Sequence, residues 1–139
     1  MIKEAMLKEK IQSMYNRVKQ HLLTQKQKSL DGFGLCLYVG LNNLKCAIGA
    51  LIPDDCLKSN MNYFGNVLKN QPIRTELAKV FSLESLEPSK QTLFMQAAYE
   101  LQEIHDRVTP EDWEQKLAEF ANGWTIIDTP MSELLGEQV

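Results

Sequence analysis

Three residues of this chain have side chains that could do chemistry together: Cys46, His105 and Asp106. A cysteine at the start of a helix can have a lowered pKa, because unpaired backbone N–H groups stabilise the thiolate. A nearby histidine could act as the base, and an acidic side chain could orient that histidine. The three residues are far apart in the sequence, which such sites allow. In an enzyme they would predict a small cysteine-dependent hydrolase or transferase.

The helical positions of these residues favour a structural role instead. His105 comes four residues after Leu101, so both side chains point to the same face of a helix, the core face. Asp106 is rotated by about 100° from that face, toward solvent. A buried cysteine usually behaves as a small apolar side chain. We therefore expect a protein that is not an enzyme, and cysteine chemistry at Cys46 is the alternative.

A metal site is not indicated by the spacing of the candidate ligands. The three cysteines stand ten residues apart, and two histidines complete the set: Cys36, Cys46, Cys56, His21 and His105. Structural zinc sites usually take their ligands in pairs about two to four residues apart. An odd number of cysteines favours free thiols over disulfides. The sequence predicts no metal and no cofactor.

Helices must position most of these side chains. Apolar residues at three- and four-residue spacing predict helices over residues 1–24, 73–81 and 90–108, with a further helix within residues 54–70. Thr109, as a capping residue, and Pro110 behind it predict the start of the last helix, with Trp113 and Trp124 on its inner face. Asn122 and Gly123 predict its end.

One nearly uncharged stretch, residues 44–52, is expected to lie at the centre of the fold. Its small residues Ala47, Gly49 and Ala50 predict close packing, and a short buried helix over residues 47–51. Residues 35–39 are β-like, residues 40–43 suit a turn, and residues 44–46 would be the returning strand. The predicted fold class is therefore α+β and mostly helical, with about five helices packed around a short β-hairpin. We expect one globular domain over residues 1–127 and a flexible C-terminal tail over residues 128–139.

Composition narrows the class of protein. Of the 139 residues, 44% are hydrophobic and 24% are charged, as in an ordinary soluble domain. The net charge of −3 argues against direct binding to nucleic acid, which needs a basic surface. The N-terminal residues lack the apolar core of a secretory signal, and no apolar run is long enough to cross a membrane. The sequence predicts a cytoplasmic protein that binds neither nucleic acid nor membranes.

Aromatic residues are candidates for binding a partner, because the centres of protein interfaces are rich in Tyr and Trp. Phe64, Trp113 and Trp124 lie at helical spacing and are assigned to the core. Tyr38 and Tyr63 are the predicted partner-binding residues.

Several short blocks of the chain form a recognisable pattern. The blocks are CxY at 36–38, LKCAIGALIPDD at 44–55, LQxxHD at 101–106 and PxxW at 110–113, with HLLxQ at 21–25 and SxDG at 29–32 before them. Together they resemble an uncharacterised family of small proteins from tailed phages and phage-derived bacterial genes. The resemblance covers about residues 18–121. This chain has Val39 where the family commonly has an arginine, and Phe64 where it commonly has an acidic residue. The family has no established activity, so the resemblance implies only a phage or mobile-element origin.

That origin and the small size of the chain favour a protein that binds and modulates another protein. In a bacterial host cell the target would be a host enzyme or a defence system such as CRISPR machinery. This expectation is one of association, because the resemblance carries no mechanism. A homodimer, with an apolar surface that is its own interface, is a third alternative.

Overall fold

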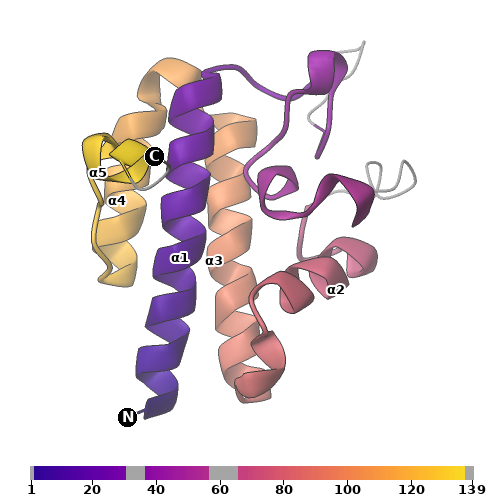
Figure 1. Ribbon diagram of the computed structural model, residues 1–139, viewed down its shortest axis with the longest axis vertical. Helices are drawn as coiled ribbons and strands as arrows, with labels where there is room; N and C mark the ends of the chain where they lie inside the picture. Colours follow the sequence, from indigo (N-terminus) through magenta and orange to yellow (C-terminus); the bar gives the residue numbers. More distant parts are fainter. Residues whose placement is uncertain (1, 31–36, 57–65, 137–139) are drawn as a thin grey trace.

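The computed structural model describes residues 2–30, 37–56 and 66–136, and within those ranges it contains helices and no strand. Three long helices form the framework: α1 (Ile2–Gln25), α3 (Pro88–Arg107) and α4 (Trp113–Trp124). Each of them contacts the other two. Helices α1 and α3 run side by side along the long axis of the molecule (Figure 1).

Shorter elements flank this three-helix framework. Two short α-helices are α2 (Gln71–Val80) and α5 (Met131–Gly136). The described single 3-10 turns are η1 (Leu41–Asn43), η2 (Gly49–Leu51), η3 (Asp54–Cys56), η5 (Leu83–Ser85) and η6 (Pro110–Asp112). Figure 1 shows α2 and the segment 37–56 on one side of α1 and α3, and α5 on the opposite side, near α4.

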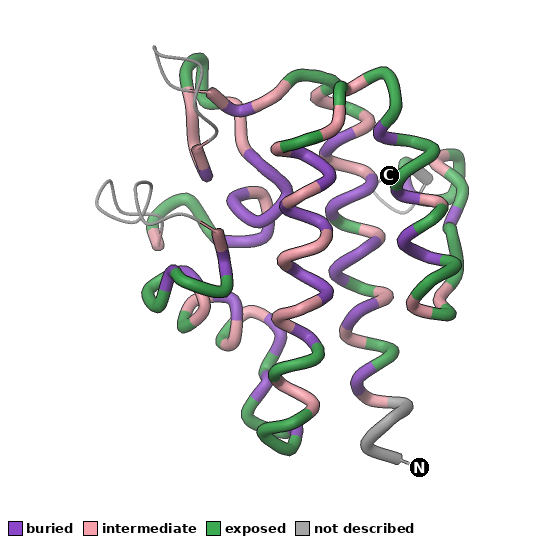
Figure 2. Tube along the Cα trace, turned by 180° about the vertical axis from the view of Figure 1, so that it is seen from behind, coloured by how far each residue is buried: buried purple, intermediate pink, exposed green. Residues whose placement is uncertain are grey.

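The predicted long N-terminal helix is confirmed as α1, and the apolar stripe along one of its faces explains why it forms. Six apolar residues of α1 are buried: Leu7, Ile11, Met14, Tyr15, Val18 and Leu22. They recur at the three- and four-residue spacing that keeps side chains on one helical face. Buried positions accordingly follow the facing sides of the long helices (Figure 2). Most of the stability of α1 therefore comes from packing rather than from helix propensity.

Helices α2, α3 and α4 also form where the apolar spacing predicts them, with differences at their ends. Asn70 caps α2, because its side-chain oxygen accepts the Ile73 N–H at 3.0 Å. The predicted cap of the last helix is wrong, since the Thr109 side chain makes no capping hydrogen bond and donates to Asp112 instead. Leu93 fits the apolar spacing of α3 but is 40% exposed, and the buried residues of this helix begin at Phe94.

The α+β class and the β-hairpin are wrong. Within the described residues the segment forms one isolated antiparallel bridge, between Val39 and Lys45, and no strand. The backbone groups that would extend a ladder bond elsewhere: the Leu41 N–H donates to the Leu30 carbonyl at 2.9 Å, and the Leu37 N–H donates to Ser29 at 2.9 Å. Residues 37–41 therefore hydrogen-bond to the loop after α1 instead of forming a longer ladder with residues 44–46.

The stretch 44–52 does lie in the core. Six of its residues are buried: Cys46, Ala47, Ile48, Gly49, Leu51 and Ile52. It turns after Cys46 and forms η2 against α1, a 3-10 turn rather than the predicted helix over residues 47–51. A Cβ atom on Gly49 would lie 2.1 Å from the Tyr38 carbonyl oxygen, so the backbones approach as closely as the small residues predict.

Two other segments differ from expectation. The predicted helix within residues 54–70 begins only as η3; residues 57–65 lie outside the described residues, and a turn follows before Asn70. The stretch after residue 127, expected as a flexible tail, contains α5, and Leu134 on α5 is buried.

Candidate functional site

Cys46 lies inside the protein. The residue is 1% exposed, and its Sγ accepts a hydrogen bond from the Gly49 N–H at 3.3 Å. That contact resembles a cap on η2, but η2 is a single 3-10 turn, whereas thiolate stabilisation was expected at the start of a helix. The backbone N–H of Cys46 is also used, because it donates to the Tyr38 carbonyl at 3.1 Å. Cys46 is therefore a packed and hydrogen-bonded core residue.

His105 is sealed in the core at the last turn of α3, where its side chain has no solvent exposure. Its Nε2 accepts the Ser29 N–H at 2.9 Å, which leaves the ring proton on Nδ1. Nδ1 lies 2.6 Å from Asp106 Oδ1 and donates to it. The ring also stacks on Trp113, with centroids 5.6 Å apart.

These contacts do not make a nucleophile and its base. A base must have a free nitrogen within reach of the proton that it takes, and both ring nitrogens of His105 already serve Ser29 and Asp106. Asp106 does hydrogen-bond to His105, as the enzymatic alternative requires, but the result is a link between α3 and the loop after α1. The geometry therefore favours the structural role of Cys46, His105 and Asp106.

Tyr38, a predicted partner-binding residue, is only 2% exposed. Burial raises the pKa of its hydroxyl well above the ordinary value, and the side chains of Gln102 and Asn70 hydrogen-bond to it and oppose that rise. A partner cannot reach Tyr38 in this conformation. Tyr63, the other predicted partner-binding residue, lies outside the described residues.

The candidate metal ligands do not converge in the part of the chain that the structure describes, where no three His, Cys, Asp or Glu side chains could hold an ion. Cys46 and Cys56 are free thiols, and Cys36 is outside the described residues. His21 Nε2 lies 2.8 Å from the Lys45 carbonyl oxygen. Burial lowers the pKa of His21, and the hydrogen bond with Lys45 partly opposes this.

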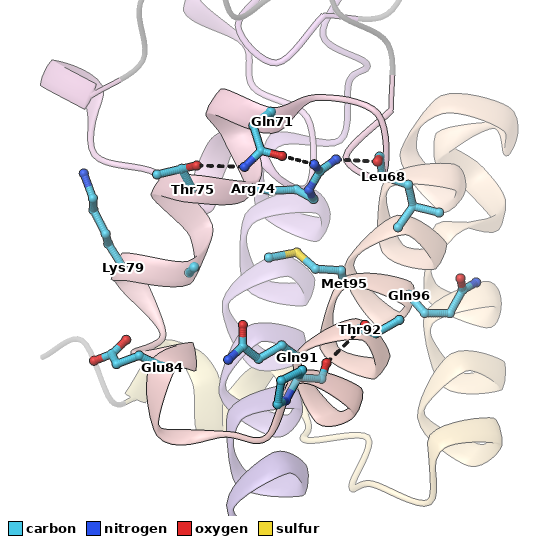
Figure 3. Close-up of a pocket in the computed structure, with 12 residues that line it drawn as sticks. Leu68, Gln71, Arg74, Thr75, Lys79, Glu84, Gln91, Thr92, Met95 and Gln96 are labelled. Carbon is cyan, nitrogen blue, oxygen red and sulfur yellow. Dashed lines mark hydrogen bonds between the residues drawn. The ribbon is translucent and has the colours of Figure 1, made fainter.

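A groove between α2 and α3 is a surface feature that sequence reasoning missed. Its volume is about 850 Å³. Eight of the twelve residues that line it have polar side chains. We call it the α2–α3 groove, and its lining residues are Leu68, Gln71, Arg74, Thr75, Ala78, Lys79, Glu84, Pro88, Gln91, Thr92, Met95 and Gln96. Met95 projects into the space between the two helices (Figure 3). Arg74 is held on one wall by hydrogen bonds to Gln71 and the Leu68 carbonyl.

The second feature that sequence reasoning missed is a set of contacts between α1 and residues 125–136, which we call the C-terminal strap. Gln12 pairs with the backbone of Ile127 in both directions, each at 2.8 Å. Lys19 Nζ lies 2.6 Å from Asp128 Oδ1 and 2.8 Å from the Thr129 carbonyl oxygen. Gln12, Tyr15 and Lys19 lie at helical spacing on α1, a signal that could have marked a polar docking line.

The Tyr15 hydroxyl completes this cluster, 2.5 Å from Asp128 Oδ1. Burial raises the pKa of Tyr15 well above its ordinary value, and the hydrogen bond and charge of Asp128 raise it further. For Asp128, burial would raise the pKa, but the hydrogen bonds from Lys19 and Tyr15 and the charge of Lys19 outweigh burial, so the pKa is lowered.

Comparison of the chain with protein-family models, with curated proteins and with solved structures finds no match. The resemblance to a phage family, and the functions that it implies, therefore stay predictions. No helix of the described residues combines the length and the apolar character needed to span a membrane.

Proposed function

We propose that this protein is not an enzyme and that it acts by binding and modulating another protein through the α2–α3 groove. The observation that carries the proposal is the groove itself, about 850 Å³ in volume, with Met95 projecting into it among mostly polar side chains. Protein interfaces commonly combine an apolar centre with a polar rim. Methionine is well suited to such a centre, because its flexible thioether adapts to different partners.

The shape and the charges of the groove favour an amphipathic helix as the bound element. Two helices form its walls, and a partner helix can lay an apolar stripe between them. Three ionisable side chains line it, two basic and one acidic: Arg74, Lys79 and Glu84. Acidic residues beside the apolar stripe of the partner would complement Arg74 and Lys79.

The enzymatic alternative has less support. Cys46 and His105 are both buried, and His105 uses both ring nitrogens within the protein. A substrate would have to open the core to reach either side chain.

The test is capture of a partner by the immobilised protein from bacterial lysate, followed by titration with the purified partner. Bacterial lysate is chosen because of the phage resemblance. Met95→Lys should weaken binding about tenfold or more, since removing a central contact commonly costs over 1 kcal/mol. Lys79→Glu should weaken binding by charge reversal and should slow association.

Leu41→Lys is the matched control, because Leu41 is 57% exposed and does not line the groove. It should bind as the unchanged protein does. Equal affinity of the unchanged protein and Met95→Lys for the captured partner would exclude the groove as the binding site. Equal affinity of the partner for the unchanged protein and for Lys79→Glu would exclude an acidic helix as the bound element.

A further inference from the structure

The C-terminal strap lies along α1 in a defined register. Contacts advance together along both segments: Gln12 meets Ile127, Lys19 meets Asp128 and Thr129, and the end of α1 lies near α5. The strap therefore runs parallel to α1. In Figure 1 its yellow trace rises beside α4 and ends in α5, which lies near α1. These contacts join two stretches of chain that residues 26–124 separate in the sequence.

Two contacts give the strap its specificity. The side chain of Lys19 is 5% exposed, and its ammonium is neutralised by Asp128. The groups that bind the Lys19 ammonium, the Asp128 carboxylate and the Thr129 carbonyl oxygen, both belong to the strap. Leu134 is 1% exposed and anchors α5. An acidic side chain and a leucine six residues later are thus what this face of α1 binds.

The strap is joined to α4 by a strained residue. Thr125 has φ 56° and ψ 47°, in the left-handed region. A β-branched residue is unusual there, and the conformation costs about 1–2 kcal/mol for a residue other than glycine. Its N–H donates to Asn122 and the Ile126 N–H donates to Ala121, so the chain reverses sharply at the end of α4. Any rearrangement that straightens this hinge relieves the strain.

Packing around α5 is incomplete. Hollows of about 650 and 480 Å³ flank it, and Leu135, which is 50% exposed, lines both. Six residues are too few for a helix that is stable by itself. The strap is therefore bound chiefly through its specific contacts and can leave its site more easily than α1 or α3 can.

We propose that two copies of this chain exchange their C-terminal straps to form a dimer. Each strap then makes the same contacts with Lys19, Tyr15 and the Leu134 site of the other copy. Both Thr125 hinges open, so the dimer gains relief of strain at two positions and gives up the hydrogen bonds of the Thr125 and Ile126 N–H groups to the end of α4. Exchange of an identical element is a low-cost route to a dimer, and a strained hinge favours it. The α2–α3 groove lies on the other side of the molecule and stays open, so this inference stands apart from the proposed function.

A charge-swap experiment tests the exchange directly. Lys19→Glu places two acidic side chains against each other, at positions 19 and 128, and Asp128→Lys places two basic side chains there. This holds in the monomer and in a dimer of two identical chains. In a mixture, each strap finds an opposite charge only in the other variant. The expected result is a 1:1 dimer from the mixture by light scattering, with both single variants monomeric. A mixture that stays monomeric overturns the proposal.

The double variant Lys19→Glu/Asp128→Lys is the control, because it restores the pair within one chain. Its stability and its tendency to form a dimer should equal those of the unchanged protein. Exchange is supported if, of the two single variants and their mixture, only the mixture forms a dimer. If the single variants do not fold, the unchanged protein decides the question. It should form a dimer as its concentration rises toward about 1 mM, and Thr125→Gly should weaken that dimer by about fivefold for each hinge. An unchanged protein that is monomeric throughout, or a dimer unaffected by Thr125→Gly, refutes the proposal.

Discussion

Replacing Gly49 by alanine tests how closely the segment 37–56 is packed. The added Cβ atom would lie 2.1 Å from the Tyr38 carbonyl oxygen and 2.9 Å from its carbonyl carbon. Both atoms belong to the backbone, so no side-chain rotation can make room. The same carbonyl oxygen accepts the Cys46 N–H at 3.1 Å, so a shift that relieves the clash also weakens this hydrogen bond.

The magnitude follows from these two effects. Overpacking in a well-packed core costs about 1–3 kcal/mol. Weakening a buried hydrogen bond adds about 1 kcal/mol. We expect Gly49→Ala to lower the free energy of unfolding by about 3 kcal/mol, and Gly49→Val by more. With a urea dependence of about 2 kcal/mol per molar, the midpoint of unfolding should fall by about 1.5 M.

Gly123→Ala is the matched control, because a Cβ atom on Gly123 meets nothing within 4 Å and the residue lies in α4. It should stabilise the protein by about 0.5–1 kcal/mol, the preference of a helix for alanine over glycine. Urea titration followed by circular dichroism measures both variants. A Gly49→Ala protein with the midpoint of the unchanged chain would refute the close approach of Gly49 to Tyr38.

Three further predictions address separate contacts. The pKa of Asp128 is lowered, so the stabilisation that its carboxylate provides is present above the ordinary carboxyl pKa near 3.8 and is lost as the pH falls through the lowered pKa. The urea midpoints of the unchanged chain and Asp128→Asn should therefore differ at pH 6 and converge in stronger acid. Cys46 should resist a small alkylating reagent until the protein unfolds, because it is 1% exposed; rapid labelling of the folded protein at Cys46, located by mass spectrometry, would revive the enzymatic alternative. Asn70→Ala should cost about 2 kcal/mol, because it removes both the α2 cap and the hydrogen bond to Tyr38, and Thr109→Ala only a few tenths, since Thr109 does not cap its helix; equal losses in thermal melts would contradict this difference.

The helices and their buried faces could be predicted from the sequence, because they depend on a repeated local pattern. The stripe from Leu7 to Leu22 marks α1 without knowledge of what lies against it. The same holds for the close approach at Gly49, where small residues within an apolar run predicted tight packing. Leu93 shows the limit of the pattern. It lies at the edge of the apolar stripe of α3, and whether such a residue is buried depends on which elements pack against that edge.

The hairpin could not be excluded from the sequence, because its fate depends on hydrogen bonds to a distant loop. Residues 35–39 have strand-like composition, but the described backbone groups of Leu37 and Leu41 bond to Ser29 and Leu30. Local preference for a strand was overridden by tertiary contacts.

Among the candidate site residues, the orientation of His105 by Asp106 could be predicted, since the two are adjacent. The hydrogen bond from the Ser29 N–H to the other ring nitrogen could not be predicted, because Ser29 is 76 positions away from His105 in the sequence. The C-terminal strap was missed for the same reason. Its partners Gln12, Tyr15 and Lys19 look like ordinary residues of an amphipathic helix until Asp128 is placed beside them.

The contacts between α1 and the strap also have a consequence for the time at which the protein can finish folding. Lys19 and Thr129 are 110 positions apart, so α1 leaves the ribosome long before its partners have been made. At about 5–20 residues per second, the delay is on the order of ten seconds. During that interval the apolar face of α1 lacks part of its cover, and chaperones have their best opportunity to bind the nascent chain.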